Sequence, residues 1–363
     1  MSLALDQAAK GLYTTQPNPR VGCVLAKNSK VIATGWHLKA GGRHAEVVAL
    51  ESAGKLADGA TAYVTLEPCS HTGRTPPCAD ALINAGIKRV VIATKDPNPQ
   101  VNGDGYNRLK SAGLSIECGL MSEDAEELNV GFFKRMRSGQ PWVRVKIASS
   151  LDGRTALKNG DSKWISSQAS RNDVQIWRAR ASAILTGIGT VLADDPQMTA
   201  RVQEPPLQPL RVIVDTKWRT PVRSRIMGDV SRVLIAGDEN CDPPEALRET
   251  GVALLPLETT EGKINLKVLM LHLASCEINE IQVEAGARLC GGLLLGSLVD
   301  EILLYQAPVL LGEDAPGLFS MGVLESMNEK ISLERTAVDP LGCDLRMRFR
   351  TKSRLSNPGR VKA

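Results

Sequence analysis

The sequence predicts an α/β protein with two domains. Short β-branched or apolar runs alternate along the chain with amphipathic helical patterns, the order typical of sheets covered by helices. The length of 363 residues exceeds that of most single domains. A polar stretch at 137–141 interrupts the alternation, and a strong strand pattern follows it. We therefore expect one domain over residues 1–140 and a second over residues 141–363.

The elements of the first domain are expected from hydrophobic periodicity and from the turn residues between periodic runs. Helical patterns cover residues 2–12, 44–59, 78–86, 106–113 and 122–136. Strand patterns cover residues 21–26, 60–68, 89–94 and 114–118. This alternation of helices and strands is the α/β order.

The second domain repeats the same alternation. Strand patterns are expected over residues 142–153, 183–187, 210–216 and 232–237, and a helix over residues 168–181. The residues between 187 and 210, which include a Pro-rich stretch at 204–209, are expected to form a loop. Near the end, a strand–helix–strand unit is expected over residues 281–286, 287–298 and 299–312. The basic, turn-rich tail at 351–363 is expected to be peripheral or mobile.

Four residues of the first domain form the strongest chemical signal in the chain. His44 and Glu46 open one helical pattern. Cys69 follows a strand pattern, and Cys78 opens the next helical pattern. One imidazole and two thiolates leave a fourth position open on a tetrahedral zinc ion, which is the layout of a catalytic site. The sequence therefore predicts a zinc site with a carboxylate beside it.

The chemistry indicated by this site is the hydrolytic deamination of an aromatic amine. Zinc lowers the pKa of bound water to about 7 and so supplies hydroxide at neutral pH. Glu46, in the same helical turn as His44, is the expected proton shuttle, as in zinc deaminases with the signature H-x-E followed by P-C-x-x-C. A thiolate at the start of a helix, as expected for Cys78, is also electrostatically favoured.

Other interpretations of these residues remain open from the sequence. Free cysteines are more often buried apolar residues than metal ligands. A scaffolding or nucleotide-binding protein with a structural zinc would have a fourth protein ligand and no need for Glu46. An RNA or nucleoside deaminase would have a tight C-x-x-C and a basic, aromatic-bearing surface, whereas eight residues separate Cys69 from Cys78.

The composition excludes several classes of protein. Hydrophobic residues make up 43% of the chain and charged residues 23%, as in ordinary globular proteins. The formal net charge of +4 is too small to indicate a nucleic-acid partner, and no apolar run is long enough for a transmembrane helix. No signal peptide is evident, and the eight cysteines are scattered. We therefore expect a cytoplasmic protein without a membrane partner.

Longer motifs reveal a resemblance to a known family. The chain resembles the deaminase half of the bacterial bifunctional deaminase–reductase family of riboflavin biosynthesis in PNPRVG (17–22), HAE (44–46), TLEPCSHTGRTPPC (65–78) and KDPNPQVNGDG (95–105). That family carries a long insertion between its two cysteine ligands, so the wide cysteine spacing supports the resemblance. The resemblance implies a cytidine-deaminase-like, three-layer αβα fold for the first domain.

The second domain resembles the reductase half of the same family. The matching motifs are KIASSLDGRTA (146–156), SKWIS (162–166), TGIGTVLADDPQMTAR (186–201), RVIVDT (211–216) and VEAG (283–286). The resemblance covers essentially the whole chain in the same order. It implies a dihydrofolate-reductase-like α/β fold with NADPH as cofactor. The glycine pair within GIGT is not a Rossmann fingerprint.

For the first domain, the resemblance implies the zinc ligands and the proton shuttle already described. Asn18 matches the family position that contacts the pyrimidine. His71 and Arg74, in the insertion between the cysteines, are candidates for substrate contact. From the residues alone, His71 could instead pack within the loop, and Arg74 could be a solvated surface charge.

For the second domain, the resemblance implies two sets of contacts. The NADPH positions fall on Ala148, Trp164, Thr190, Asp194, Thr216, Gly286, Ala287, Arg288, Leu289, Cys290, Gly291 and Gly292. The substrate positions fall on Ser162, Arg178, Met198, Arg201 and Glu284. The glycines that open the helical pattern after 281–286 suit a phosphate. The two arginines could grip the substrate phosphate bidentately, or could be ordinary surface arginines.

The resemblance implies two consecutive reactions on a pyrimidine ribonucleotide. The first deaminates 2,5-diamino-6-(5-phosphoribosylamino)pyrimidin-4-one. The second reduces the ribosyl group with NADPH to give 5-amino-6-(5-phosphoribitylamino)uracil, and Glu284 is expected only to orient the ribose hydroxyls. A homodimer or higher homo-oligomer is expected. The complete motifs of both halves argue against an enzyme in which one domain is degenerate.

Overall fold

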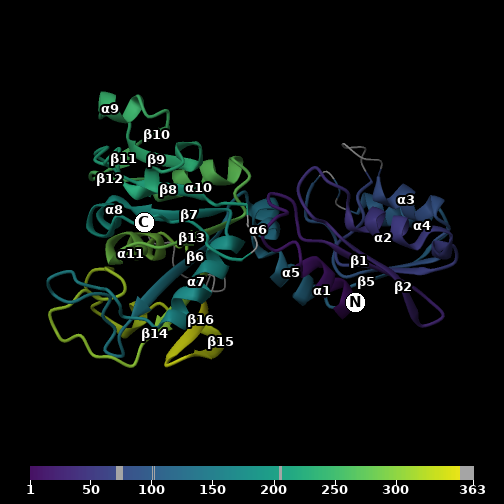
Figure 1. Cartoon of the computed structure of the whole chain (residues 1–363). Coiled ribbons are helices and arrows are strands. Elements are labelled where there is room, and N and C mark those ends of the chain that lie inside the picture. The colour runs from purple at the N-terminus through teal and green to yellow at the C-terminus, as the bar shows by residue number, and fades with distance from the viewer. Residues whose placement is uncertain (71–76, 100, 102, 204–206, 352–363) are drawn as a thin grey trace. The chain divides into compact units, whose positions relative to one another are not determined.

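The computed structural model describes residues 1–363 except 71–76, 100, 102, 204–206 and 352–363. The chain divides into two compact units, Met1–Pro141 and Trp142–Ala363, each with its own sheet (Figure 1). Within the described ranges, no helix combines the length and the apolar character needed to cross a membrane.

The first unit is built around a five-stranded sheet with the order β2-β1-β3-β4-β5. Its strands are β1 (Gly22–Lys27), β2 (Lys30–Trp36), β3 (Thr61–Val64), β4 (Arg89–Ile92) and β5 (Ser115–Cys118). Its helices are α1 (Ser2–Ala9), α2 (Ala45–Ala53), α3 (Cys78–Asn84), α4 (Asp104–Ser111), α5 (Ser122–Leu128) and α6 (Val130–Ser138), with the 3-10 turn η1 (Gly54–Ala57). β1 pairs antiparallel with β2 and β3, and β3, β4 and β5 run parallel.

Helices cover both faces of this sheet, so the unit has three αβα layers as expected. α2, α3 and α4 lie on one face, and α1 and α5 lie on the other (Figure 1). The core on the first face is made of small and aliphatic side chains, among them Ala49, Leu82 and Val64. Gly35 in β2 allows α2 to approach closely, because a Cβ there would lie 2.2 Å from the Ala45 carbonyl oxygen. This close approach sets the start of α2 against the sheet.

The second unit contains a nine-stranded sheet with the order β10-β9-β8-β7-β13-β6-β14-β16-β15. Its strands are β6 (Trp142–Ser149), β7 (Ala183–Gly187), β8 (Leu210–Val214), β9 (Val233–Asp238), β10 (Ala253–Leu257), β13 (Glu280–Val283), β14 (Glu301–Gln306), β15 (Leu333–Leu341) and β16 (Asp344–Thr351). The first seven strands in this order, which begin with β10 and end with β14, run parallel to one another. β16 and β15 are antiparallel to their neighbours. A separate two-stranded ribbon pairs β11 (Thr259–Thr260) with β12 (Lys263–Ile264).

Helices also cover both faces of the second sheet. They are α7 (Gln168–Arg180), α8 (Ile188–Asp194), α9 (Glu245–Arg248), α10 (Leu266–Ser275) and α11 (Ala287–Leu295), with the 3-10 turns η2 (Arg225–Met227), η3 (Val230–Arg232) and η4 (Met327–Glu329). Residues of α10 and α11 such as Leu273 and Leu293 pack in the largest core. Val174 and Trp177 of α7 pack against Leu303 and Tyr305 in a smaller core.

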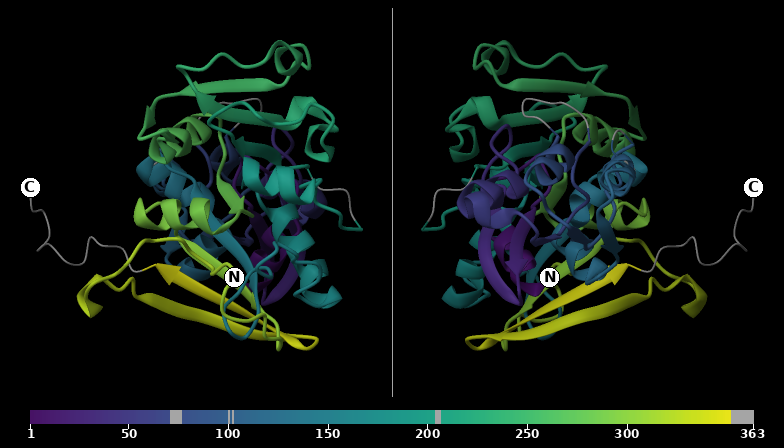
Figure 2. Two further views of the ribbon diagram at one scale, coloured as in Figure 1. Left: turned by 90° about the vertical axis from the view of Figure 1, so that its left-hand side faces the viewer. Right: turned by 90° about the vertical axis from the view of Figure 1, so that its right-hand side faces the viewer.

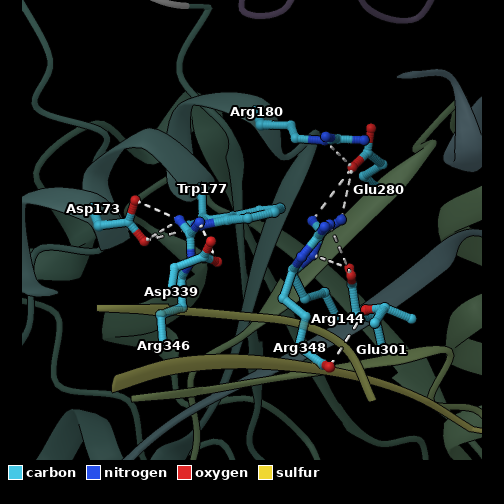
Figure 3. A network of polar contacts seen from close by, with 10 residues as sticks. Arg144, Asp173, Trp177, Arg180, Glu280, Glu301, Asp339, Arg346 and Arg348 are labelled. Atoms are coloured by element: carbon cyan, nitrogen blue, oxygen red, sulfur yellow. Dashed lines mark hydrogen bonds and ion pairs between the residues drawn. The ribbon is translucent and has the colours of Figure 1, made fainter. Parts of the chain in front are cut away.

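A buried ion-pair network lies between α7 and the strands beneath it (Figure 3). Arg144 of β6 bonds to both Glu280 of β13 and Glu301 of β14, and its side chain is 2% exposed. Arg180 of α7 adds a second cation to Glu280, with 2.8 Å between Nε and Oε2. The Arg144 guanidinium also lies 4.4 Å from the centroid of the Trp177 ring. Each buried carboxylate thus has a cation beside it.

Several elements differ from the expectation. The helix expected over residues 122–136 is two helices, because Asn129 leaves the helical conformation with a φ of −120°. Its side chain instead bonds to the backbone N–H and C=O of Arg20. The loop expected between 187 and 210 contains α8, whose Ile188 and Val191 are buried. The strand expected over residues 60–68 is shorter and ends at Val64.

Other elements were absent from the expectation altogether. These are β2, β10, β11, β12, β15, β16, α9 and α10. The β15–β16 hairpin, the long yellow pair of strands in Figure 2, is the largest of them. It extends the sheet beyond β14, which corresponds to the last strand that the sequence predicted along the chain.

Candidate active sites

The predicted zinc ligands meet in the first unit. The Nδ1 atom of His44 lies 3.2 Å from the Cys78 Sγ and 3.6 Å from the Cys69 Sγ. The Cys78 backbone N–H points at the Cys69 Sγ, with 3.4 Å between N and S. All three ligand atoms lie within 4.8 Å of one another. Local structure explains this convergence, because His44 is the N-cap residue of α2, Cys78 opens α3, and Cys69 lies in the loop after β3.

The donor set fits a tetrahedral zinc ion. Ligand bonds of about 2.1 Å to nitrogen and 2.3 Å to sulfur put neighbouring donors about 3.6 Å apart in a tetrahedron. The separations between His44 and the two sulfurs are close to this value. Hydrogen bonds from the Cys78 thiol and from His44 lower the pKa of the Cys69 thiol, which favours the thiolate form that a zinc ligand takes.

Glu46 lies in the first turn of α2 and is 3% exposed. Burial, followed by the negative charge of Cys69, raises the pKa of its carboxyl to about 7. A carboxyl group with a pKa near neutrality can both accept and release a proton. Glu46 therefore has the position and the proton affinity expected of a proton shuttle.

Asn18 is connected to the metal site by His37, a residue that the sequence prediction missed. Its Nδ2 atom is 3.1 Å from the Nε2 of His37. The His37 ring meets the His44 ring edge-on, with 5.3 Å between their centroids. Burial lowers the pKa of His37. The signal in the sequence was a second histidine seven positions before His44, but nothing there linked it to Asn18.

Glu67 is a second residue that the prediction missed. It is 3% exposed, and its carboxylate accepts bonds from the backbone N–H groups of Asp96, Gly103 and Tyr106, at 3.2, 3.2 and 3.0 Å. Glu67 thus ties the loop that carries Cys69 to the segment before and within α4. The sequence signal was an acidic residue in an otherwise apolar strand pattern.

His71 and Arg74, the predicted substrate contacts of the insertion, lie outside the described residues. Their roles therefore stay predictions.

In the second unit, three of the predicted substrate residues come together. Arg178 makes a two-pronged ion pair with Glu284, at 2.7 and 2.8 Å. Its Nη2 is 3.8 Å from the Met198 Sδ, and its Nη1 donates to the Thr199 carbonyl. The guanidinium edge that was expected to face a phosphate is therefore occupied by Glu284. Arg201 is exposed and joins this group through the Thr199 hydroxyl, at 3.2 Å.

The charge of Glu284 is fixed by its neighbours. Burial alone would raise its pKa, but Arg178 and then Lys146 outweigh burial and lower it to about 2. Gln282 also donates to Glu284, at 2.8 Å. Glu284 is therefore a carboxylate at any ordinary pH.

Ser162, the remaining predicted substrate residue, is half-buried in the segment that precedes α7.

Most of the predicted NADPH positions lie at or after the ends of four strands of the second sheet. Ala148 is in β6, Thr190 and Asp194 follow β7 in α8, and Thr216 follows β8. The 286–292 segment follows β13. These four strands are parallel neighbours, so their carboxyl ends share one edge, where nucleotides bind in open α/β sheets. Trp164, in the segment before α7, is 71% exposed.

Only the beginning of the 286–292 segment faces this edge. Gly286 caps α11 and has open space at its Cβ position, and Arg288 is exposed. The first-turn N–H groups of α11, which includes Ala287 and Leu289, have no acceptor within the helix and suit a phosphate. The Cys290 side chain is buried in the core, and Gly291 packs against the Ser320 carbonyl, so these two residues face inward. Gly292 packs against Leu266.

Comparisons with known proteins identify the family of each unit. Residues 1–94 match the family model of the cytidine and deoxycytidylate deaminase zinc-binding region. Residues 141–346 match the model of the RibD C-terminal domain. The riboflavin biosynthesis protein RibD of Escherichia coli K12 is 46% identical over 359 residues, covering 95% of this chain and 96% of that protein. RibD of Haemophilus influenzae is 44% identical and covers 97% and 96% of the two chains.

Solved structures give the same answer. Acinetobacter baumannii RibD has a TM-score of 0.91 and 44% identity, with 97% of this chain and 98% of that chain covered. A Thermotoga maritima diaminohydroxyphosphoribosylaminopyrimidine deaminase/5-amino-6-(5-phosphoribosylamino)uracil reductase has a TM-score of 0.87 and 33% identity, covering 97% of each chain. The two folds therefore agree with the cytidine-deaminase-like and dihydrofolate-reductase-like expectation. The chain belongs to the RibD family of riboflavin biosynthesis proteins.

Proposed function

We propose that the chain is a bifunctional enzyme of riboflavin biosynthesis. The first unit deaminates 2,5-diamino-6-(5-phosphoribosylamino)pyrimidin-4-one, and the second reduces the product to 5-amino-6-(5-phosphoribitylamino)uracil. The observation that carries the proposal is the convergence of His44, Cys69 and Cys78 beside a buried Glu46, in a chain related to RibD over 95% of its length. The Thermotoga maritima relative bears the names of both activities.

In the deaminase unit, His44, Cys69 and Cys78 would hold zinc. Bound zinc supplies a hydroxide nucleophile at neutral pH. Glu46 takes up the proton released there, delivers one to the ring nitrogen and assists the departure of ammonia. Its pKa of about 7 suits both directions of transfer. Asn18 holds the pyrimidine ring against this group.

In the reductase unit, the shared carboxyl edge of the parallel strands would hold NADPH. Bound NADPH supplies the hydride. Glu284 and Arg178 face the substrate, and Glu284 orients the ribose hydroxyls as an acceptor, because its carboxylate is ionised. Arg201, which is exposed next to this pair, is available to attract the substrate phosphate. The remaining predicted contacts of this unit keep the roles that the family resemblance implies.

We further propose a homodimer or higher homo-oligomer in the cytoplasm, without nucleic acid or membrane as partner. The eight cysteines, all within the described ranges, are free, as is usual for proteins of a reducing compartment. Sedimentation of the purified chain would test the oligomeric state.

A two-readout assay tests the proposed function. The diaminopyrimidine substrate is supplied, and ammonia release and NADPH oxidation are followed separately. Glu46→Gln is expected to abolish ammonia release while it spares zinc content and the reduction of deaminated substrate, because glutamine cannot carry the proton. Glu51→Gln, an exposed change in the same helix, is the matched control and should behave as the parent. Normal ammonia release from Glu46→Gln would contradict the assigned role.

A further inference from the structure

His37 connects the expected substrate contact Asn18 to the backbone of the metal site. Its ring follows β2 and is 3% exposed. Its Nδ1 lies 3.0 Å from the carbonyl oxygen of Arg43, and its Nε2 lies 3.1 Å from the Asn18 Nδ2. Arg43 immediately precedes His44. One buried ring thus touches both the residue expected to read the pyrimidine and the segment that presents a metal ligand.

The Arg43 carbonyl fixes which ring nitrogen of His37 carries the proton. A carbonyl oxygen can only accept a hydrogen bond, so Nδ1 must be the donor. Both ring nitrogens face neutral groups, and a buried imidazolium without a carboxylate partner would be costly. The neutral ring then has one proton, on Nδ1, and Nε2 presents a lone pair.

The lone pair on Nε2 in turn fixes the orientation of the Asn18 amide. The Nδ2–H of Asn18 can donate a hydrogen bond to Nε2. If the amide were flipped, Oδ1 would lie against Nε2, and two acceptors would repel each other. Oδ1 is therefore directed away from His37. The Asn18 backbone N–H is held by the Thr15 carbonyl at 2.9 Å, which restrains the rest of the residue.

We propose that His37 is a positioning residue for deamination, which holds Asn18 so that Oδ1 accepts a hydrogen bond from an N–H or amino group of the pyrimidine. The proposal rests on the proposed deaminase activity and specifies its ring recognition. A ring edge that presents a donor satisfies Oδ1, whereas an edge that presents only acceptors meets its lone pairs and is rejected. His37 also bonds to the carbonyl of Arg43, which precedes the metal ligand His44. The His37 ring therefore positions the Asn18 side-chain amide relative to that ligand.

Two substitutions at position 37 separate the two ring nitrogens. The side-chain amide of His37→Asn reaches only the Nδ1 position, so it can bond to the Arg43 carbonyl but not to Asn18. The amide of His37→Gln reaches the Nε2 position, and its oxygen can accept from the Asn18 Nδ2. We expect His37→Asn to lower deaminase kcat/KM by about tenfold to 100-fold, because a misoriented contact misplaces the ring. His37→Gln should recover most of that loss.

A double-mutant cycle with Asn18→Ala tests whether His37 acts through Asn18. Once Asn18 is removed, His37→Asn should cause no further loss of kcat/KM. Zinc content by metal analysis and the rate of NADPH oxidation with deaminated substrate should equal those of the parent in every variant.

Each other outcome overturns the proposal. An equal loss in the parent and Asn18→Ala backgrounds would show that His37 contacts substrate itself or acts on the scaffold. A His37→Gln enzyme as impaired as His37→Asn would exclude the acceptor role of Nε2, and loss of zinc would assign His37 to the metal site. A parent enzyme that releases no ammonia would instead refute the proposed deaminase function, which is a separate result.

Discussion

Two buried carboxylates show how neighbours decide the chemistry of a residue. Glu46 and Glu284 are both removed from water, and burial raises the pKa of each. The nearest charge shifts the two pKa values in opposite directions. The negative charge of Cys69 raises the pKa of Glu46 further, whereas the positive charge of Arg178 lowers that of Glu284. The results are a pKa of about 7 for one and about 2 for the other. Glu46 can therefore exchange a proton near neutrality, whereas Glu284 can only present charge and accept hydrogen bonds.

The first prediction concerns the stability that Glu284 contributes. Its pKa in the folded state lies below the unfolded value, so its stabilising effect is present above pH 4.5 and is lost as the pH falls toward 2. Glu284→Gln should destabilise the second unit by about 3 kcal/mol at pH 7 and by progressively less below pH 4. Thermal unfolding as a function of pH measures this difference.

Glu313→Gln is the matched control for that experiment, because Glu313 is exposed in the same unit. It should leave the unfolding temperature unchanged at both ends of the pH range. A Glu284→Gln penalty that is the same at pH 7 and pH 3 would mean that lost packing, and not the ion pair, is responsible.

The zinc ligands could be predicted from the sequence because each is a ligand-type residue at the boundary of a predicted helix or strand. His44, Cys69 and Cys78 each open a helix or follow a strand, and each carries a ligand-type side chain. His37 and Glu67 could not be found in this way. Their roles depend on partners at Asn18 and at 96–106, and such pairings exist only after the chain has folded.

At the scale of elements, the fold was predicted best where hydrophobic periodicity is clean. β7 spans Ala183–Gly187, the range expected, and α7 differs from its expectation by one residue. The β15–β16 hairpin was missed because β15 is largely exposed on both faces and therefore lacks an apolar alternation. The break at Asn129 was missed because its cause is a hydrogen bond to Arg20, far away in sequence.

The second prediction concerns the packing of α4 on the metal loop. A Cβ at Gly105 would lie 1.9 Å from the carbonyl oxygen of Pro68, the residue before Cys69. Gly105→Ala must therefore shift either α4 or the loop, at a cost of about 1–3 kcal/mol. We expect a lower unfolding temperature of the first unit and weaker zinc retention during dialysis. Asn107→Ala, at an exposed position of the same helix, is the control, and equal zinc retention in both variants would refute the coupling.

The third prediction concerns the network that joins β6, β13 and β14 beneath α7 (Figure 3). Arg144→Leu removes the cation that Glu280 and Glu301 share, so Glu280 keeps the ion pair with Arg180 at 2.8 Å and Glu301 keeps the longer pair with Arg348 at 3.7 Å. Removal of one partner of such a buried network costs about 3–5 kcal/mol. Urea denaturation should show this loss. Lys158→Ala breaks an exposed pair with Asp314 in the same unit and should change nothing measurable. Similar midpoints for the two variants would show that the network does not stabilise the fold.

At the scale of the whole molecule, each unit has its own hydrophobic core. The clusters around Val64 and Phe133 draw all their residues from the first unit. The clusters around Leu273, Ile213 and Tyr305 draw theirs from the second. A unit with a complete core can unfold as a cooperative element of its own.

The final prediction follows from this division of the cores. A ligand stabilises the unit that binds it, by about 2.7 kcal/mol at 100 times its Kd. Saturating NADPH should therefore raise the unfolding temperature of the second unit by roughly 5–10 °C, since 1 kcal/mol corresponds to about 2–4 °C for a unit of this size. Zinc chelation should lower only the transition of the first unit. Calorimetry of the full chain, with Glu46→Gln as a zinc-retaining control, measures both shifts. If NADPH or zinc chelation shifted both transitions, the unfolding of the two units would be coupled, and the prediction would be wrong.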